Sequence, residues 1–546
     1  MPFFQLVRRE MQGSLNRLVL MAALGGISTA SILAAINSGA QAADSGRPSL
    51  WSAMLFIIAL LLFIKTQSYV LLTATAEIEG IIHKVRVRLM NHVRQSELLP
   101  LDEIGRAEIV AAITRETTVL AQASNTLAFA AQGAVLITFV ALYVAYLSLL
   151  AFALSVVIVG IAAALFHSRN RQLAKATQES SQWENRLYNR VMDLLDGFKE
   201  VRLNHPRSED LYGDILEVSR TAANIKIRTQ AETFKRMVLL QSSMYAMLGA
   251  IVFAVPVLTD TLAGAQIGKT VTALVFVIGA CFGLVQSIPI LSAANAAAAN
   301  IERLEARLAA AAAGIRGEAE PAARFDRIEM RNVAFSYVEK STDAVFRVGP
   351  VDFTLRSGEL VFITGGNGSG KSTFLKLLAS LYKPDSGEIT LDGVLVTDRT
   401  REAYRQLMSA IFVDYHLFQR LYGIPDPDPV ETDRLLAQFH LLDKTHLMNG
   451  EFDTIDLSTG QRKRLALIVS MLEKRPILLL DEWAADQDPE FRRKFYFDLL
   501  PSLHRAGVTL VAVSHDDRYL DEMDLPARRL RMDEGRFVAE AVAETS

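Results

Sequence analysis

Six apolar stretches in residues 1–310 constrain the fold more than any other feature. A helix needs about 20 apolar residues to cross roughly 30 Å of hydrocarbon. Residues 121–167 are too long for one crossing, so we place a tight hairpin at Ser148. The sequence therefore predicts an α-helical six-span transmembrane domain. Its expected spans are Leu18–Asn37, Trp51–Thr73, Leu127–Tyr146, Leu149–His167, Met237–Leu258 and Val271–Leu291.

Lysine and arginine predict the orientation of these spans. The segments between spans two and three and between spans four and five are rich in both residues, whereas the opposite loops hold almost none. Basic loops stay in the cytoplasm. We therefore expect both long segments, both termini and everything after span six to be cytoplasmic. Because Arg8, Arg9 and Arg17 precede the first stretch and further spans follow it, we expect a retained anchor and no cleaved signal.

The long cytoplasmic segments favour helices that continue beyond the membrane. They are rich in helix-forming residues, and the polar Pro- or Gly-containing places are Leu99–Asp102 and Leu195–Glu200. We expect the chain to turn at both places.

Charge and cysteine content exclude two classes of protein. The chain has 57 Lys and Arg against 60 Asp and Glu, a net charge of −3, and no basic arm, so we expect no nucleic-acid partner. Its one cysteine, Cys281, lies in an apolar span and cannot form a disulfide within the chain. We expect Cys281 to be a small core residue.

The segment Gly365–Ser372 fits the pattern G-x-x-x-x-G-K-[ST]. It follows an apolar run at 360–364 and precedes a helix-like run at 373–381, which is the context of a phosphate-binding loop. Glycines let backbone N–H groups approach phosphates at a helix N-terminus. Lys371 is expected to reach the β- and γ-phosphates, and the Ser372 hydroxyl to hold Mg²⁺. The expected contacts to ATP are Gly365, Asn367, Gly368, Gly370, Lys371, Ser372 and Thr373.

Three further motifs follow in a fixed order. Leu457–Gln461 reads L-S-T-G-Q, Ile477–Glu482 is an apolar strand ending in Asp-Glu, and His515 follows the apolar run 509–513. Together with the phosphate loop, and downstream of membrane spans, these motifs resemble those of ABC transporters. The resemblance implies an α/β P-loop ATPase domain of ABC type at residues 326–546, joined by a linker at 311–325.

The resemblance also implies residue roles. Glu482 would be the general base, His515 would contact the γ-phosphate, and Lys371 would complete the catalytic set. Asp481 would bind Mg²⁺ together with Ser372, and Tyr337 would stack on adenine. The residues implied to contact ATP from a second copy are Ser458, Gly460 and Gln461. Asp488 would be the D-loop aspartate, a cofactor-binding residue that passes information between the two ATP sites.

The chain departs from the family pattern at two places. The family has a glutamine before Leu417-Phe418, but residues 411–416 contain none, so Asp414 is the nearest carboxylate that could sense Mg²⁺. After Glu482 the family usually has Thr-Ser-Ala-Leu-Asp, whereas this chain has Trp-Ala-Ala-Asp-Gln-Asp at 483–488.

One ATPase domain and six spans make half a transporter. A composite ATP site combines the phosphate loop of one domain with the L-S-x-G-Q motif of another. We therefore expect a symmetric homodimer that hydrolyses ATP to drive transport.

Spans fused to a C-terminal ATPase are the exporter arrangement. Three blocks, at 197–203, 412–418 and 457–467, resemble the cyclic-peptide exporter family, whose members export pyoverdine precursors, syringomycin-type lipopeptides and lasso-peptide microcins. This resemblance implies export of a small cyclic or lasso-like peptide or siderophore precursor from a bacterial inner membrane, in contact with lipid. The alternative is a lipid or multidrug flippase of the same architecture.

Overall fold

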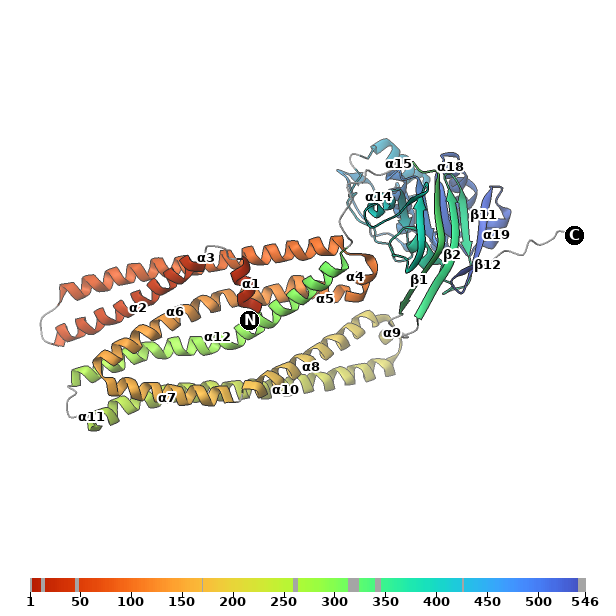
Figure 1. The fold of residues 1–546 in the computed structure, drawn as a ribbon. Helices are drawn as coiled ribbons and strands as arrows, with labels where there is room; N and C mark the ends of the chain where they lie inside the picture. Colours follow the sequence, from red (N-terminus) through yellow and green to blue (C-terminus); the bar gives the residue numbers. More distant parts are fainter. Residues whose placement is uncertain are drawn as a thin grey trace. The chain divides into compact units, whose positions relative to one another are not determined.

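The computed structural model describes residues 2–10, 15–44, 49–168, 170–258, 264–312, 324–338, 345–424 and 427–538 (Figure 1). They form two units: Met1–Met90 with Ala107–Glu305, and Asn91–Arg106 with Ala306–Ser546. Most of the expected linker at 311–325 lies outside the described residues.

Within its described residues the first unit consists of helices that run side by side (Figure 1). A π-helical turn at Ala250–Ala254 precedes Pro256, which has no N–H to donate to the preceding turn. The helices are α1 (Pro2–Glu10), α2 (Leu15–Asp44), α3 (Leu50–Gln95), α5 (Arg106–Ala111), a π-helical turn (Ala112–Glu116), α6 (Thr117–Leu147), α7 (Leu149–Ser168), α8 (Asn170–Asp196), α9 (Phe198–Leu203), α10 (His205–Gly249), α11 (Val255–Leu258) and α12 (Gly264–Ala311), the last residues of α3 and α12 belonging to the second unit.

The predicted apolar stretches coincide with these helices. By length and composition, 5 helices among the described residues can cross a membrane: Asn16–Ala42, Leu50–Gln95, Phe129–Leu147, His205–Val257 and Ile267–Ala311. The fourth predicted stretch is the shorter apolar helix Leu149–Ala164. Ser148 is extended, with φ −159° and ψ 112°, and its hydroxyl accepts a hydrogen bond from the Ala151 N–H at 3.2 Å. This break between α6 and α7 confirms the predicted hairpin.

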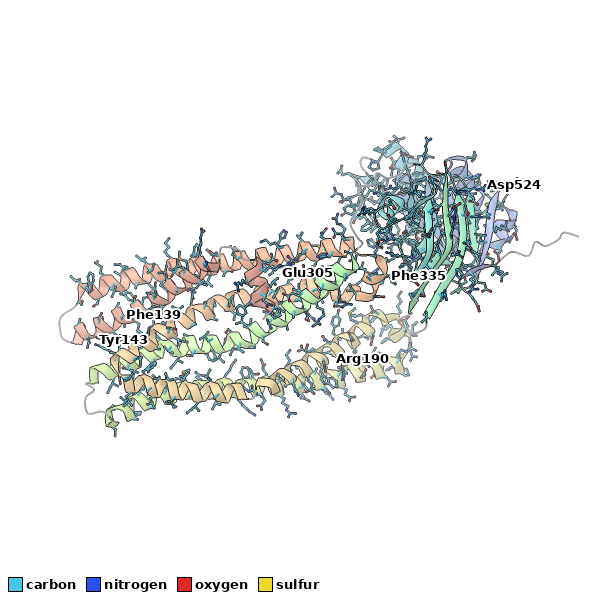
Figure 2. All side chains as sticks on the ribbon, in the orientation of Figure 1. Phe139, Tyr143, Arg190, Glu305, Phe335 and Asp524 are labelled. Carbon is cyan, nitrogen blue, oxygen red and sulfur yellow. The ribbon has the colours of Figure 1, made fainter. Side chains whose placement is uncertain are left out.

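The core of the first unit lies between α6, α7, α10 and α12. Val144, Met247 and Leu274 are buried there, and Tyr143, one turn from Phe139 on α6, packs against them (Figure 2). Cys281 packs against the same cluster, as expected of a small core residue.

Several helices are much longer than a membrane crossing. The 46 residues of α3 would extend about 69 Å at 1.5 Å per residue, compared with about 30 Å of hydrocarbon. Helices α8 and α10 lie side by side, and Arg190 on α8 pairs with Asp214 on α10 at 2.8 Å (Figure 2). The short helix α9 makes the turn between them, at the predicted place. The Asn204 side chain caps α10 by accepting from the Arg207 N–H at 3.2 Å.

The described part of the second unit has two large sheets and a small antiparallel pair, β7-β8. A 6-stranded sheet has the order β12-β11-β3-β10-β9-β6, in which β11, β3, β10, β9 and β6 run parallel. An antiparallel sheet has the order β2-β1-β4-β5. The strands are β1 (Arg327–Val338), β2 (Val345–Arg356), β3 (Leu360–Thr364), β4 (Ser386–Leu391), β5 (Val394–Leu395), β6 (Met408–Ile411), β7 (Leu447–Met448), β8 (Glu451–Phe452), β9 (Ile477–Asp481), β10 (Thr509–Val513), β11 (Ala527–Asp533) and β12 (Arg536–Val538).

Helices cover the parallel sheet, whose strands β9 and β10 are buried along their whole length. The short helix α4 (Leu98–Ile104) belongs to this unit, and Leu98 and Leu99 pack against its core. The other helices are α13 (Lys371–Leu378), α14 (Arg401–Arg405), α15 (Pro429–Gln438), α16 (Thr459–Leu472), a 3₁₀ turn (Trp483–Asp486), α17 (Pro489–Lys494), a π-helical turn (Phe495–Leu499), α18 (Leu500–Arg505) and α19 (Asp517–Glu522).

Candidate nucleotide site

Three parallel strands bring the sequence motifs to one edge of the sheet. Val513, the last residue of β10, is in register with Asp481 of β9 on one side and with Ile363 of β3 on the other. The phosphate loop, the Asp481-Glu482 pair and His515 all follow directly from these strand ends. The carboxyl ends of parallel strands are where ligands bind in open α/β sheets. The structure thus places together motifs separated by about 150 residues of sequence.

The phosphate loop folds around its own lysine. The Lys371 ammonium donates to the carbonyls of Gly365 at 3.0 Å and Gly366 at 2.8 Å. Gly370 precedes α13 with φ 102°. At Gly365, where φ is 145°, an added Cβ would lie 2.1 Å from the Met532 carbonyl oxygen, so only glycine fits.

The remaining residues of the loop are divided between its tip and its helix. Asn367 and Gly368 form an exposed tip, Ser372 is half-buried, and Thr373 is buried in the first turn of α13. Each expected phosphate-binding residue therefore belongs to one continuous loop–helix element.

Asp481 provides a fit test for a divalent cation. The side chain is buried, it is hydrogen-bonded to Ser372, and its Oδ1 atom has no hydrogen-bond partner among the described residues. Burial raises the pKa of Asp481, opposed by the Ser372 hydrogen bond and by the charges of Lys376 and Lys371. A buried carboxylate oxygen without a partner is costly, and oxygen ligands are what Mg²⁺ requires. The Asp481 and Ser372 pair therefore fits a magnesium ion.

Glu482 and His515 lie side by side at this edge. The His515 Nε2 atom is 3.1 Å from Glu482 Oε1. Glu482 has a left-handed backbone, with φ 50° and ψ 37°, and its N–H donates to the Val513 carbonyl at 3.2 Å. Its side chain is partly exposed, so water can reach the carboxylate. The geometry allows Glu482 to accept a proton from, or orient, a water molecule.

The Lys371 ammonium is affected by the two carboxylates of this site, Asp481 and Glu482. Burial lowers the pKa of Lys371, while the carboxylates of Glu482 and Asp481 act in the opposite direction. An additional anion, such as a phosphate, would favour the charged ammonium further.

Tyr337 belongs to an aromatic cluster on the antiparallel sheet. Its ring lies 5.6 Å from that of Phe346 and 6.1 Å from that of Phe335, which stacks on Tyr382 at 4.9 Å (Figure 2 labels Phe335). Tyr337 itself is half-buried, which leaves part of its surface open to a planar ligand.

The residues of the L-S-T-G-Q segment lie away from the phosphate loop of the same domain, around the start of α16. The Ser458 hydroxyl accepts from the Gln461 N–H at 3.4 Å, and the Gln461 side chain accepts from the Ser458 N–H at 3.1 Å, which is a capping box at the start of α16. A Cβ at Gly460 would lie 2.8 Å from the Asp486 carbonyl oxygen. Asp488 caps α17 by accepting from the Phe491 N–H at 2.8 Å and pairs with Arg464. Among the described residues, these contacts lie around α16 and α17 and do not involve the phosphate loop.

Asp414 is exposed in the loop after β6. Its charge acts on Tyr382, which Asp102 of α4 also approaches closely enough to affect. Burial and these charges raise the pKa of Tyr382 to about 12. A role of Asp414 in holding Mg²⁺ stays a prediction.

Sequence reasoning missed two residues that position Glu482. The Lys463 ammonium donates to the Glu482 carbonyl at 2.9 Å and pairs with Asp486 at 2.7 Å. The Trp483 indole N–H donates to the Lys463 carbonyl at 2.8 Å. The available signal was the basic residue two positions after Gln461, together with the unusual tryptophan after Glu482.

Comparison with known proteins agrees with this geometry. Residues 348–485 match the family described as ABC transporter. Over 96% of its length the chain is 32% identical to the ATP-binding protein SyrD of Pseudomonas syringae pv. syringae, of which it covers 93%. The chain belongs to the ABC transporter family. Its own activity is therefore that of an ATP-hydrolysing translocase of the exporter type.

One further relative matches part of this ABC transporter, and one solved structure matches nearly all of it. Over 39% of its length it is 30% identical to the β-(1→2)glucan export ATP-binding/permease protein NdvA of Agrobacterium fabrum, covering 36% of that protein. A solved structure of a bacterial Atm1-family ABC exporter with ATP bound superposes with a TM-score of 0.77 at 18% identity, covering 97% of this chain and 94% of that one. The fold is thus that of an ABC exporter along almost the whole chain.

Replacing Tyr337 by alanine should weaken ATP binding by about 5- to 150-fold, because stacking of one base on an aromatic ring contributes about 1–3 kcal/mol. Tyr337→Phe keeps the ring and should bind within about twofold. Titration of the two variants with a fluorescent ATP analogue checks this. Equal affinity of wild type and Tyr337→Ala would exclude adenine stacking at this residue.

Proposed function

We propose that this ABC exporter works as a homodimer that moves a small peptide, cyclic or lasso-like, or a siderophore precursor out of the cytoplasm across a bacterial inner membrane. The observation that carries the choice of cargo is an uncharged cavity with amide side chains inside the helical unit. The similarity to SyrD along nearly the whole chain and the three cyclic-peptide exporter blocks support the same choice.

The cavity has a volume of about 380 Å³ and is lined by α2, α3, α6 and α12. Its walls combine glycines with two aromatic and two amide side chains: Phe63, Phe129, Gln132 and Gln286. Among its lining residues there is no Asp, Glu, Lys or Arg. The Gln132 Nε2 atom is buried without a hydrogen-bond partner among the described residues.

These properties favour an uncharged peptide segment. An unsatisfied amide donor favours a ligand with carbonyl acceptors, which every peptide bond supplies. Aromatic and glycine surfaces accept apolar side chains and close approach of a backbone. A heavy-metal or anionic conjugate would instead need thiol, imidazole or guanidinium groups at the cavity wall.

A second copy of the chain would complete the ATP site. Ser458 is exposed, and Gly460 and Gln461 are half-buried. This exposure supports a contact between these residues and the phosphate loop of a second copy. The tip of the α8–α10 hairpin also lacks a partner within the described part of this unit, because Phe198 and Leu203 of α9 are 59% and 88% exposed. Such apolar exposure favours docking on the ATPase domain of a second copy.

We assign the catalytic roles by residue. Lys371 and the loop amides of Gly365, Asn367, Gly368, Gly370, Ser372 and Thr373 bind the phosphates, with Tyr337 on adenine. Glu482 orients and deprotonates the attacking water, and His515 holds Glu482 and contacts the γ-phosphate. Mg²⁺ on Asp481 and Ser372, with Asp414 as a further candidate, would neutralise charge on the β- and γ-phosphate oxygens.

Transport follows from the coupling of domain closure to the spans. ATP drives closure only through its higher affinity for the closed dimer, and hydrolysis by Glu482 removes that preference. The basic residues of the long segments support a cytoplasmic location of α8, α9 and the ATPase domain, where ATP is available.

The test is ATP hydrolysis by the full-length protein in lipid nanodiscs, titrated with cyclic peptides, lasso peptides, siderophore precursors, lipids and drugs. We expect saturable stimulation by an uncharged peptide, and loss of that stimulation in Gln132→Leu without loss of basal hydrolysis. Asn37→Leu, in α2 but outside the cavity lining, is the matched control. Stimulation by lipids or drugs alone would replace the peptide proposal with a flippase.

A further inference from the structure

A half-buried acidic residue lies at the turn between α3 and α4. Glu97 follows the last turn of α3 and directly precedes α4, and its N–H donates to the carbonyl of Ala311 at the end of α12 at 3.0 Å. All these residues belong to the second unit. Glu97 therefore stands where the ends of two long helices of the membrane domain meet.

Two arginines of α14 hold the Glu97 carboxylate. Arg405 Nη2 lies 2.5 Å from Glu97 Oε2, and Arg401 Nη1 lies 3.6 Å from Glu97 Oε1. Glu97 and Arg401 are largely removed from solvent, with 18% and 8% of their side chains exposed. Arg401 also pairs with the more exposed Asp398 at 2.8 Å. The Arg405 contact is a charge-assisted hydrogen bond, which is stronger than a neutral one, whereas the Arg401 contact is an ion pair at longer distance. Partial burial shields both contacts from salt.

The same short helix holds the end of the phosphate-loop helix. Helix α13 begins at Lys371 and ends at Leu378, so the carbonyls of its last turn need donors from elsewhere. The Tyr404 hydroxyl donates to the Leu378 carbonyl at 2.7 Å, and Arg405 Nε donates to the Ser380 carbonyl at 2.9 Å. Arg401 Nε donates to the Ser380 hydroxyl at 3.1 Å.

These contacts form one connected path. Helix α13 begins with Lys371 and Ser372, and its C-terminal end is hydrogen-bonded to α14. Helix α14 in turn pairs with the carboxylate of Glu97, just after the end of α3. Each arginine touches both Glu97 and Ser380, so a movement of α13 must either move Glu97 or break an ion pair. Because α3 is a single helix from Leu50 to Gln95, a displacement of its end is carried along the helix.

We propose that Glu97 is a positioning residue that couples the nucleotide-dependent movement of α13 to α3 through Arg401 and Arg405. Its negative charge is the essential property, because the two guanidinium groups need an anion to bridge them. Glu97 belongs neither to the nucleotide site nor to the cavity lining described above. The proposal therefore depends on ATP-driven export and is independent of which cargo is moved.

The experiment separates ATP binding from the response of α3. A bimane fluorophore is attached to Leu50→Cys, at the exposed start of α3, in a Cys281→Ser background of the full-length protein in nanodiscs. Half-maximal ATP concentration for the bimane response is compared with ATP affinity from a fluorescent analogue and with the KM for hydrolysis. In the background protein these values should agree within about twofold.

Glu97→Gln should leave ATP affinity within about twofold but raise the half-maximal concentration for the bimane response about fivefold or more, the factor given by about 1 kcal/mol of coupling. Glu97→Asp, which keeps the charge, should restore most of the response. Glu79→Gln, an exposed glutamate on the same helix, is the matched control and should behave as the background protein.

Arg405→Gln tests the same path from the other side, since glutamine can still donate to Ser380 but carries no charge. It should give the same separation of binding and response, and the double variant Glu97→Gln/Arg405→Gln should add little to either change. The proposal would be overturned if, in Glu97→Gln or Arg405→Gln, the half-maximal ATP concentration for the bimane response still agreed with the ATP affinity as it does in the background protein. Additive effects in the double variant, or an equal change in Glu79→Gln, would overturn it as well.

Discussion

Replacing Glu482 by glutamine should slow ATP hydrolysis by about 10²- to 10⁴-fold, the usual contribution of general acid–base catalysis. Glutamine has the shape of glutamate and can still bond to His515, which lies 3.1 Å away. It cannot accept a proton from water. ATP binding should therefore remain within about threefold of wild type, while phosphate release over time falls almost to background.

The control for this variant is Glu490→Gln, because Glu490 is an exposed carboxylate of α17 outside the strand-end site. Its hydrolysis rate should equal that of wild type. Hydrolysis by Glu482→Gln at more than a tenth of the wild-type rate would show that another group activates the water. Loss of ATP binding in Glu482→Gln would point instead to a disturbed loop, and single-turnover measurements distinguish the two.

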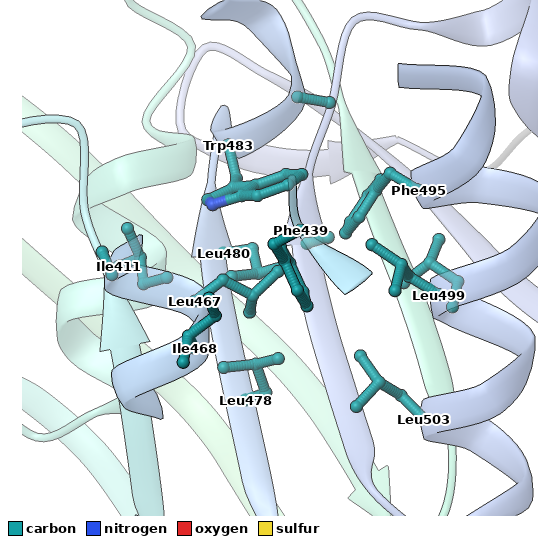
Figure 3. Packing of buried hydrophobic residues seen from close by; sticks show 14 of the residues in the cluster. Ile411, Phe439, Leu467, Ile468, Leu478, Leu480, Trp483, Phe495, Leu499 and Leu503 are labelled. Carbon is teal, nitrogen blue, oxygen red and sulfur yellow. The ribbon is translucent and has the colours of Figure 1, made fainter. Parts of the chain in front are cut away.

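Replacing Trp483 by alanine should destabilise the ATPase domain by about 3–5 kcal/mol, because deletion of a fully buried aromatic side chain leaves a cavity. Trp483 is 1% exposed and packs on Phe495 with ring centroids 4.6 Å apart, next to Phe439, Leu467 and Leu480 (Figure 3). In a domain of this size the melting temperature should fall by roughly 6–20 °C. Scanning calorimetry of the full-length protein measures this transition.

Trp483→Phe separates packing from the hydrogen bond. Phenylalanine keeps most of the buried surface but cannot donate to the Lys463 carbonyl, so the expected cost is about 1–3 kcal/mol, the penalty of leaving a buried acceptor without its partner. Lys463 also supports the Glu482 backbone. We therefore expect Trp483→Phe to hydrolyse ATP more slowly than wild type even at temperatures where the variant is fully folded. A melting temperature of Trp483→Ala within 2 °C of wild type would contradict the core role, taking about 2–4 °C per kcal/mol for such a domain.

The parts that could be predicted depend on local patterns. The apolar stretches predicted the membrane helices because length and hydrophobicity alone decide whether a helix can cross a bilayer. The break at Ser148 was also predicted, since an unbroken helix over 121–167 would far exceed one crossing. The phosphate loop was found because its glycines and Lys371 are contiguous and sit between an apolar strand and a helix.

The long-range contacts could not be predicted in the same way. Glu97 is 308 residues from Arg405 in the sequence, and no local pattern marks either as a partner. Trp483 reads as a departure from a family motif, and only the packing of α16, α17 and the following π-helical turn around it explains why an indole fits there. Whether Asp414 can reach a metal ion also depends on the conformation of the loop after β6, which no local sequence pattern specifies.

By itself the sequence determined the membrane helices, the ATPase motifs and their order, because these features are written in contiguous residues whose chemistry acts locally. Only the tertiary structure decided which of those residues meet: the strand order that brings Asp481, Glu482 and His515 to the phosphate loop, the support of Glu482 by Lys463 and Trp483, and the bridging of Glu97 to α13. The reason is physical, since burial, ion pairing and hydrogen-bond satisfaction depend on neighbours in space, and the folded chain alone selects those neighbours.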